Sequence, residues 1–271
     1  NVPMFDARFV NLEQGTGIVH CAPSHGVDDF NLCLKNNIES KYTVDNSGYY
    51  TDEIPHFKNI HVFKADPIVI EKLKEEKKLL KDDKLQHSYP HSWRSKAPLI
   101  YRATPQWFIS METNSLRKKA IKAINDTSFY PSKGKERLMS MIESRPDWCV
   151  SRQRVWGVPL PIFINKKTKE PLRDKKVIDR IAEIYEKEGS DCWFTDDQKK
   201  FLGDDYDEKD YEKLKDIVEV WFDSGSTHSF VLEKRSDLKW PADMYLEGSD
   251  QHRGWFHSSL LESCGTRGRA P

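Results

Sequence analysis

Apolar residues recur at intervals of three or four in several segments of the chain, and this spacing predicts amphipathic helices. One helix is expected from about Asp28, and another at Asp66-Pro67, where a capping acid precedes a proline at the first helical position. The predicted apolar faces are Val69, Leu73 and Leu80; Leu116, Ala120, Ala123 and Ile124; Leu138, Met141 and Ile142; and Val177, Ile181, Ile184 and Tyr185.

Other segments have the alternation of a β-strand. Val218–Phe222 alternates and ends in Asp223-Ser224-Gly225, and Met244–Gly248 is a second predicted strand, followed by a helix near Asp250. The runs 89–94 and 99–109 are predicted as strands interrupted by proline. Strands that end in glycine turns and lead into helices indicate an α/β sheet, whose sites lie at the carboxyl ends of its strands.

Changes in composition divide the chain into four stretches. Residues 1–85 begin with short strands and turns, and residues 86–163 are a junction that leads into an aromatic and basic segment. Residues 164–215 are highly charged and contain one amphipathic helix, which is typical of an inserted module. Residues 216–271 carry the two alternating strands and a final helix.

Charge, cysteine spacing and hydropathy exclude several classes of protein. Lys plus Arg and Asp plus Glu each number 43 in the 271 residues, so any binding of nucleic acid must use a local patch rather than global charge. Five widely spaced cysteines without a Cys-x-x-Cys pair disfavour disulfides or a zinc site and favour a reducing cytoplasm. Neither a signal peptide nor an apolar run of about 20 residues is found, so no membrane association is expected. The first residue is Asn, so the chain is expected to be a piece of a longer protein.

The segment 245–256 is the first candidate site. Glu247 ends the predicted strand, Gly248 permits close approach of a ligand to the backbone, and Asp250 opens a helix whose N-terminal end favours anions. Gln251 and Trp255 are four residues apart and share a helical face. A carboxylate, an amide and an aromatic wall suit a small ligand with an ammonium group, hydroxyls and an apolar side chain. The alternative is a capped helix whose Asp250 satisfies only its own backbone.

Two further segments contain tryptophan in a polar context. Trp221 is predicted to face opposite to its neighbours in the strand, either as an isolated ring of a site or as part of the core. The segment 147–159 interleaves tryptophan with Arg152 and Arg154, a pattern that suits phosphate pairing and stacking on bases. The alternative there is an arginine paired with an acid and tryptophans packed in a core.

The segment 15–29 places two histidines and two aspartates around Gly and Pro turns. A metal site is conceivable, but the spacing of His20 and His25 is not a usual zinc pattern. The other interpretation pairs Asp29 with a substrate ammonium, while His20 positions a hydroxyl or a water. The N-terminal end of a helix would keep Asp29 ionised.

Several long motifs in this order resemble the isoleucyl-tRNA synthetases of bacterial and organellar type, within the class I aminoacyl-tRNA synthetases. The motifs are GTGIVH (15–20), YPHSWR (89–94), RATPQWF (102–108), WCVSRQRVWG (148–157), FDSGSTH (222–228) and EGSDQHRGWF (247–256). The resemblance implies an α/β fold: part of a Rossmann-like catalytic domain joined to part of a mostly β editing (CP1) domain, with a small α+β insertion. Residues 1–85 would belong to the editing domain, 86–163 to the return into the catalytic core, 164–215 to the insertion, and 216–271 to the second half of the catalytic domain.

The resemblance also implies residue roles. Glu247, Gly248, Asp250 and Gln251 would line the isoleucyl-adenylate site, with Asp250 at the ribose, Glu247 at the adenylate and Gln251 near the amino group. Trp221 and Trp255 would wall the pocket for the isoleucine side chain. Asp29 would hold the ammonium of a mischarged valine, and His20 would help to place its ester end. Arg152 and Arg154 are candidates for contact with tRNA or phosphate.

The implied activity is ATP-dependent activation of isoleucine, transfer to tRNA(Ile), and hydrolysis of mischarged valyl-tRNA(Ile). ATP with Mg²⁺, isoleucine and tRNA(Ile) are the expected substrates and partners, no metal is expected to bind this segment itself, and the full-length enzyme is expected to be monomeric. No segment resembles the family's two ATP-phosphate motifs or its Thr-rich editing strand, so these 271 residues alone are expected not to charge tRNA. A valine or leucine synthetase fragment is one alternative, disfavoured by His20 and the Trp255 segment. A non-catalytic tRNA-binding module is another, and a free-standing hydrolase is disfavoured by the missing Thr-rich strand.

Overall fold

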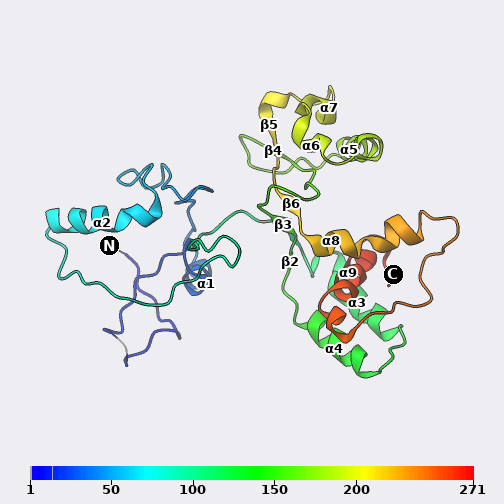
Figure 1. Cartoon of the computed structure of the whole chain (residues 1–271), viewed down its shortest axis with the longest axis horizontal. Helices are drawn as coiled ribbons and strands as arrows, with labels where there is room; N and C mark the ends of the chain where they lie inside the picture. The colour runs from blue at the N-terminus through cyan, green and yellow to red at the C-terminus, as the bar shows by residue number, and fades with distance from the viewer. Residues whose placement is uncertain (1, 14) are drawn as a thin grey trace. The chain divides into compact units, whose positions relative to one another are not determined.

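A computed structural model describes residues 2–13 and 15–271, and the chain divides into two compact units. The first unit ends at Pro105 and the second comprises residues from Gln106 to Pro271, each with its own elements (Figure 1). The division falls inside the stretch 86–163, where the composition of the chain changes.

The first unit contains two α-helices. Helix α1 (Val27–Lys35) begins one residue before the predicted Asp28, and Asp28 and Asp29 lie in its first turn. A 3₁₀ turn, η1 (Val62–Lys64), leads into α2 (Ala65–Glu75), so the helix predicted at Asp66 is confirmed. Leu80 lies beyond the end of α2 and is exposed, so its place on the helical face was wrong.

β-structure in the described part of the first unit is limited to isolated bridges. These pair Val44 with Tyr50, Tyr49 with His61, and His91 with Pro98. The strand predicted over 89–94 is therefore wrong, because prolines remove the backbone donors that a longer ladder needs. The expected mostly β character is not seen in this piece.

The second unit is built around helices. The predicted apolar faces at 116–124 and 138–142 are confirmed as α3 (Leu116–Asn125) and α4 (Lys133–Glu143). A 3₁₀ turn, η2 (Thr113–Ser115), precedes α3. Together with α9 (Trp255–Arg267) these helices enclose the main core, whose fully buried members include Met111, Ala120, Ile124, Ile142 and Cys264.

The strands of the second unit form three two-stranded antiparallel sheets. The pairs are β1 (Phe108–Ile109) with β2 (Trp148–Cys149), β3 (Ser151–Arg152) with β6 (Ile217–Val218), and β4 (Phe163–Asn165) with β5 (Tyr211–Lys213). Helices and small sheets are thus both present, as expected for an α/β chain, and every strand pair among the described residues is antiparallel. Of the strand predicted over 99–109, only β1 is present.

The strand predicted over Val218–Phe222 is wrong beyond Val218. The chain leaves β6 there and enters helix α8 (Val220–Gly225). The residue that made the pattern alternate is Glu219, whose side chain is buried rather than solvated. Buried partners of Glu219 therefore override the local β-propensity.

The charged stretch forms a small α+β module with its own core. Its helices are α5 (Lys175–Glu188), α6 (Cys192–Thr195) and α7 (Gln198–Leu202), followed by the 3₁₀ turn η3 (Glu208–Asp210). The predicted amphipathic face at 177–185 is confirmed in α5, where Val177 and Ile181 are buried. Trp193, Phe163 and Phe201 pack edge to face beneath it.

The end of the second unit carries the remaining elements. A π-helical turn, η4 (His228–Leu232), and a 3₁₀ turn, η5 (Ser249–His252), precede α9. The strand predicted over Met244–Gly248 is wrong, since no strand pairs with this segment among the described residues. Helix α9 is buried from His257 to Cys264 without interruption, as expected for a helix that is surrounded on all sides.

Candidate functional site

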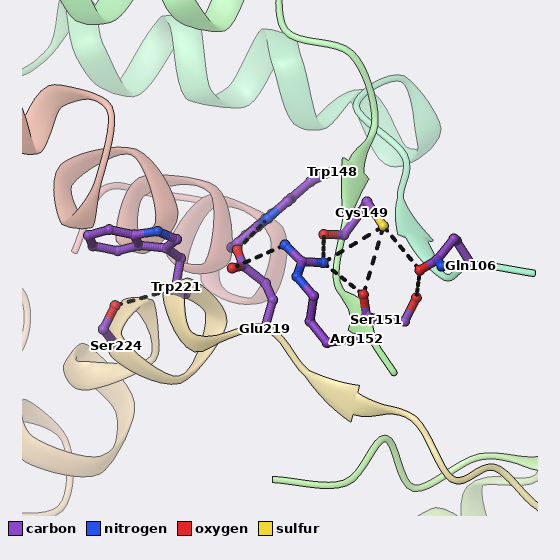
Figure 2. Close-up of polar contacts among 8 residues, drawn as sticks. All are labelled: Gln106, Trp148, Cys149, Ser151, Arg152, Glu219, Trp221 and Ser224. Atoms are coloured by element: carbon purple, nitrogen blue, oxygen red, sulfur yellow. Dashed lines mark hydrogen bonds and ion pairs between the residues drawn. The ribbon is translucent and has the colours of Figure 1, made fainter. Parts of the chain in front are cut away.

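A buried carboxylate stands where β6 gives way to α8. Glu219 is 6% exposed; its Oε1 accepts a hydrogen bond from Trp148 Nε1 at 2.8 Å, and its Oε2 forms an ion pair with Arg152 at 3.4 Å. Figure 2 shows the two side chains converging on Glu219 from the neighbouring strands. A buried charge is tolerated only when it is paired in this way.

Arg152 makes its other contacts within its own segment, with two backbone carbonyls and the Cys149 sulfur. Its Nη1 donates to the carbonyls of Cys149, at 3.0 Å, and Ser151, at 2.7 Å (Figure 2). Arg152 is thus already held by Glu219 and two carbonyls. Arg154 is exposed, and no hydrogen bond or ion pair to it is found in the described part of the chain. Of the two predicted tRNA or phosphate contacts, only Arg154 has a guanidinium that is not engaged.

Helix α8 presents Trp221 and approaches α9 closely. Trp221 is 40% exposed. A Cβ at Gly225 would collide with the Glu262 carboxylate and lie 3.0 Å from the backbone of Ser258, so only glycine allows this approach. The indole N–H of Trp255 donates to the carbonyl of Ser224 at 2.9 Å, which ties the first residue of α9 to α8.

Gly254 is the point where three of the predicted site residues meet. A Cβ there would collide with Gln251 Oε1 and lie 2.8 Å from Cη2 of Trp221. Gln251 Oε1 accepts from the backbone N–H of Trp255 at 2.9 Å. Tyr245 stacks on the Trp255 indole with ring centroids 4.3 Å apart and planes 9° from parallel. The structure therefore brings Trp221, Gln251 and Trp255 together.

The two predicted carboxylates lie on the exposed approach to this cluster. Glu247 Oε1 accepts from the N–H of Gly248, at 2.8 Å, and does not end a strand. Asp250 is exposed in η5, and its Oδ2 accepts from Gln251 Nε2 at 3.1 Å. Neither Ser249 nor Asp250 caps the following helix, because α9 begins only at Trp255. Asp250 is linked to the cluster through Gln251, whereas no contact joins Glu247 to the indoles in the described residues.

The interface of α8 and α9 holds further titratable groups in a dry environment. Burial, with Asp223 and Glu219 nearby, raises the pKa of Glu262 to about 9. Burial also lowers the pKa of His257 to about 3, with Arg145 and Arg253 adding to the effect. Burial lowers the pKa of the Arg145 guanidinium as well, although Glu219 opposes this shift. At neutral pH Glu262 and His257 are therefore both uncharged.

An apolar hollow of about 260 Å³ lies next to Trp148. Its lining includes Trp148, Phe222, His228, Leu261 and Glu262. None of the sequence-predicted site residues lines it.

In the first unit, Asp29 organises the predicted editing segment. Its Oδ2 accepts from the backbone N–H of Ala22 at 2.9 Å, which holds the turn after Cys21 against α1. Burial, and next the Asp29 charge, raise the pKa of the Cys21 thiol. His20 is exposed, and no contact to Asp29 is found in the described part of this unit. His25 bonds Thr43 and the Tyr101 carbonyl through its two ring nitrogens, both at 2.8 Å, which makes it a structural residue.

Sequence reasoning missed Glu219, Tyr245 and Gly254. Glu219 has a recognisable signal, a single acidic residue inside the apolar run 217–222. Tyr245 and Gly254 have none, because their roles depend on contacts that form only when the segment folds over α8 and α9. Across residues 2–13 and 15–271, no group of three acidic, histidine or cysteine side chains is placed to hold a metal ion, and no helix has the length and apolarity to cross a membrane.

Known proteins match the chain along nearly its whole length. The sequence profile of the tRNA synthetases class I (I, L, M and V) matches residues 24–271. An isoleucine–tRNA ligase of Pelagibacter ubique is 73% identical over 271 residues, which is 100% of this chain and 30% of the relative. Isoleucine–tRNA ligases of Gluconobacter oxydans and Laribacter hongkongensis are 51% and 47% identical, over 100% and 99% of this chain and 29% of each relative.

The matched relatives are much longer, since the chain spans only about 30% of their length. The family match covers both units, from α1 to the end of α9. The chain belongs to the class I tRNA synthetases of the isoleucine, leucine, methionine and valine group.

Proposed function

We propose that the protein containing this chain is an isoleucine–tRNA ligase, in which this chain supplies part of the amino-acid site and part of the editing site. The observation that carries the proposal is the meeting of Trp221, Gln251 and Trp255 at Gly254. Relatives named isoleucine–tRNA ligase, similar over the whole chain, support it.

The amino-acid site would work by shape and by polar contacts. Two indoles offer apolar walls for a branched side chain, with Tyr245 stacked behind Trp255. Gln251 Oε1 already accepts one hydrogen bond, and its second lone pair can accept from an α-ammonium group. Both carboxylates are exposed beside it, and Asp250 would contact the ribose and Glu247 the adenylate.

In the reaction, the isoleucine carboxylate attacks the α-phosphorus of ATP, and the α-phosphorus–oxygen bond to pyrophosphate breaks. The aminoacyl group then passes to the terminal ribose of tRNA(Ile), releasing AMP. ATP brings Mg²⁺ with it as substrate. The contribution of this chain is to fix the amino acid and the adenylate in position.

The proposed editing site would correct the weak discrimination between isoleucine and valine in the amino-acid site. One missing methylene changes binding by only about 1–3 kcal/mol, and isoleucine against valine is itself the standard example of this limit. Asp29 would hold the ammonium of a mischarged valine in a second, smaller site. The hydrogen bond from Ala22 to Asp29 supports this role, because it fixes the carboxylate beside the His20 segment.

Pyrophosphate exchange by the full-length protein tests the proposed function. With a panel of amino acids, the expected result is exchange that depends on isoleucine, weaker exchange with valine, and none with methionine. Preference for valine or leucine would reassign the chain within its family, and the absence of exchange with any amino acid would favour a non-catalytic tRNA-binding protein. The 271 residues alone are expected to give no exchange.

A further inference from the structure

We propose that Glu219 is a positioning residue that fixes Trp221 and thereby sets the affinity for the amino acid. This inference rests on the proposed function, since it assigns a task within the same site. Its role is indirect, because it stands at the start of helix α8, which carries Trp221.

The side chain of Glu219 joins α8 to a buried part of the core. Its partner Trp148 is 6% exposed and packs against Phe222 with ring centroids 6.1 Å apart. The hydrogen bond from Trp148 Nε1 and the ion pair with Arg152 engage both carboxylate oxygens. Both oxygens already have a protein partner and the residue is only 6% exposed, which favours a supporting role over a ligand-binding one.

The backbone of Glu219 is fixed at the same place. Its N–H donates to the carbonyl of Val150 at 2.9 Å, and the N–H of Val150 donates to Trp107, also at 2.9 Å. Its carbonyl accepts from Phe222 at 2.9 Å, which is the first turn of α8. Glu219 is therefore the N-cap residue of α8, and its backbone ties the start of that helix to Val150, between β2 and β3.

Trp221 lies two residues further along, in the first turn of α8. Its ring rests on Gly254, where even a methyl group would not fit. A small rotation of the first turn of α8 would shift the ring along or away from Gly254 and change the width of the pocket. Misplacement of binding groups by about 1 Å is known to be costly in enzymes.

Burying the Glu219 carboxylate costs desolvation free energy, so its use at the start of α8 supports a specific positioning role. An apolar side chain at this position would avoid the desolvation of a carboxylate. The carboxylate adds directional contacts, because its two oxygens engage Trp148 and Arg152 at the same time (Figure 2).

The test is Glu219→Gln in the full-length protein, which keeps an acceptor for Trp148 and removes the charge facing Arg152. Trp148→Phe is the second variant, because it removes the N–H donor and keeps a ring in the core. In pyrophosphate exchange, both variants should raise the KM for isoleucine about tenfold while the KM for ATP stays within about twofold. The preference for isoleucine over valine in kcat/KM should fall as well.

The matched control is Glu233→Gln. Glu233 also pairs with an arginine, Arg267, at 2.8 Å in the same unit, and no contact joins it to Trp221 in the described residues. The Glu233→Gln variant should lower the thermal midpoint of unfolding without changing the KM for isoleucine.

If Glu219→Gln and Trp148→Phe behave like this control, Glu219 is only structural and the inference is overturned. If the wild-type protein shows no isoleucine-dependent exchange, the proposed function is contradicted, and so is the inference that rests on it. If Glu219→Gln does not fold, Trp148→Phe decides alone.

Discussion

The indole N–H of Trp255 donates to the backbone carbonyl of Ser224 at 2.9 Å, so the first residue of α9 is tied to α8 just after Trp221. The same carbonyl accepts from Thr227 Oγ1 at 2.6 Å, which fixes its direction. The Trp255 indole is thus tied by a hydrogen bond within the chain to α8, the helix that carries Trp221.

Trp255→Phe should weaken isoleucine activation, because the variant keeps an aromatic wall and loses the bond to Ser224. We expect kcat/KM for isoleucine in pyrophosphate exchange to fall about tenfold, mainly through KM. Trp193→Phe is the control, since Trp193 Nε1 makes an equivalent bond to the Leu214 carbonyl at 2.8 Å inside the charged module. A similar change of KM in both variants would mean that Trp255 acts only through stability.

Asp29→Asn removes the negative charge of Asp29 but keeps an oxygen that can accept the hydrogen bond from Ala22. The amide oxygen can still accept from the N–H of Ala22, while the attraction for an ammonium group is lost. We expect hydrolysis of valyl-tRNA(Ile) by the full-length protein to slow by about tenfold or more. Asp29→Ala should let valyl-tRNA accumulate, while isoleucine activation stays near normal. Asp28→Asn, the neighbouring acid in the same helical turn, should clear valyl-tRNA as the wild type does; equal clearance by Asp29→Asn would remove Asp29 from editing.

Arg154→Ala should weaken the interaction with tRNA. Its guanidinium is exposed and has no partner in the described part of the chain, so it is available for a phosphate. We expect a higher KM for tRNA(Ile) in aminoacylation and a smaller salt dependence of tRNA binding, by about one unit of slope. Arg173→Ala, at an exposed arginine in the charged module, should change neither quantity. The same KM in both variants would exclude Arg154 as a tRNA contact.

Glu262→Gln should make the stability of helix α9 less dependent on pH. In the folded protein Glu262 keeps its proton up to a pKa of about 9, whereas an unfolded carboxyl loses it near 4.5. The protonated carboxyl contributes fully to the free energy of unfolding below about pH 4.5. This contribution is lost as the pH rises toward 9, by up to about 1.4 kcal/mol per pH unit. Hydrogen exchange of α9 amides should therefore show a falling free energy of opening in the wild type and a flatter one in the variant. Equal slopes would show that Glu262 is ionised in the folded state.

Helical periodicity predicted much of this fold. The faces of α3, α4 and α5 were readable because one side of each helix packs on a core and the other is solvated. The short strands were not, since segments of two or three residues are fixed by their partners rather than by their own pattern. Glu219 is the clearest case: its polarity suggested a solvated strand position, and its burial under Trp148 produces the start of a helix.

The candidate site was predictable in its residue types but not in its geometry. The spacing of Gln251 and Trp255 indicated a shared face, yet the bond between them caps the start of α9 instead of lying along the helix. Tyr245 was assigned to a strand, although it stacks on Trp255. Such contacts depend on how distant segments meet, and local patterning does not encode them.

Binding of a non-hydrolysable isoleucyl-adenylate analogue to Gly254→Ala in the full-length protein is the most direct test of the central claim. The added methyl group would collide with Gln251 and Trp221, so we expect affinity to fall by about 100-fold or more, measured by titration calorimetry. Gly265→Ala is the control, because its nearest neighbour, Leu116 Cδ1, is 3.6 Å away, an ordinary contact, and it should bind as the wild type does. Wild-type affinity in Gly254→Ala would contradict the claim that Trp221, Gln251 and Trp255 form the amino-acid site.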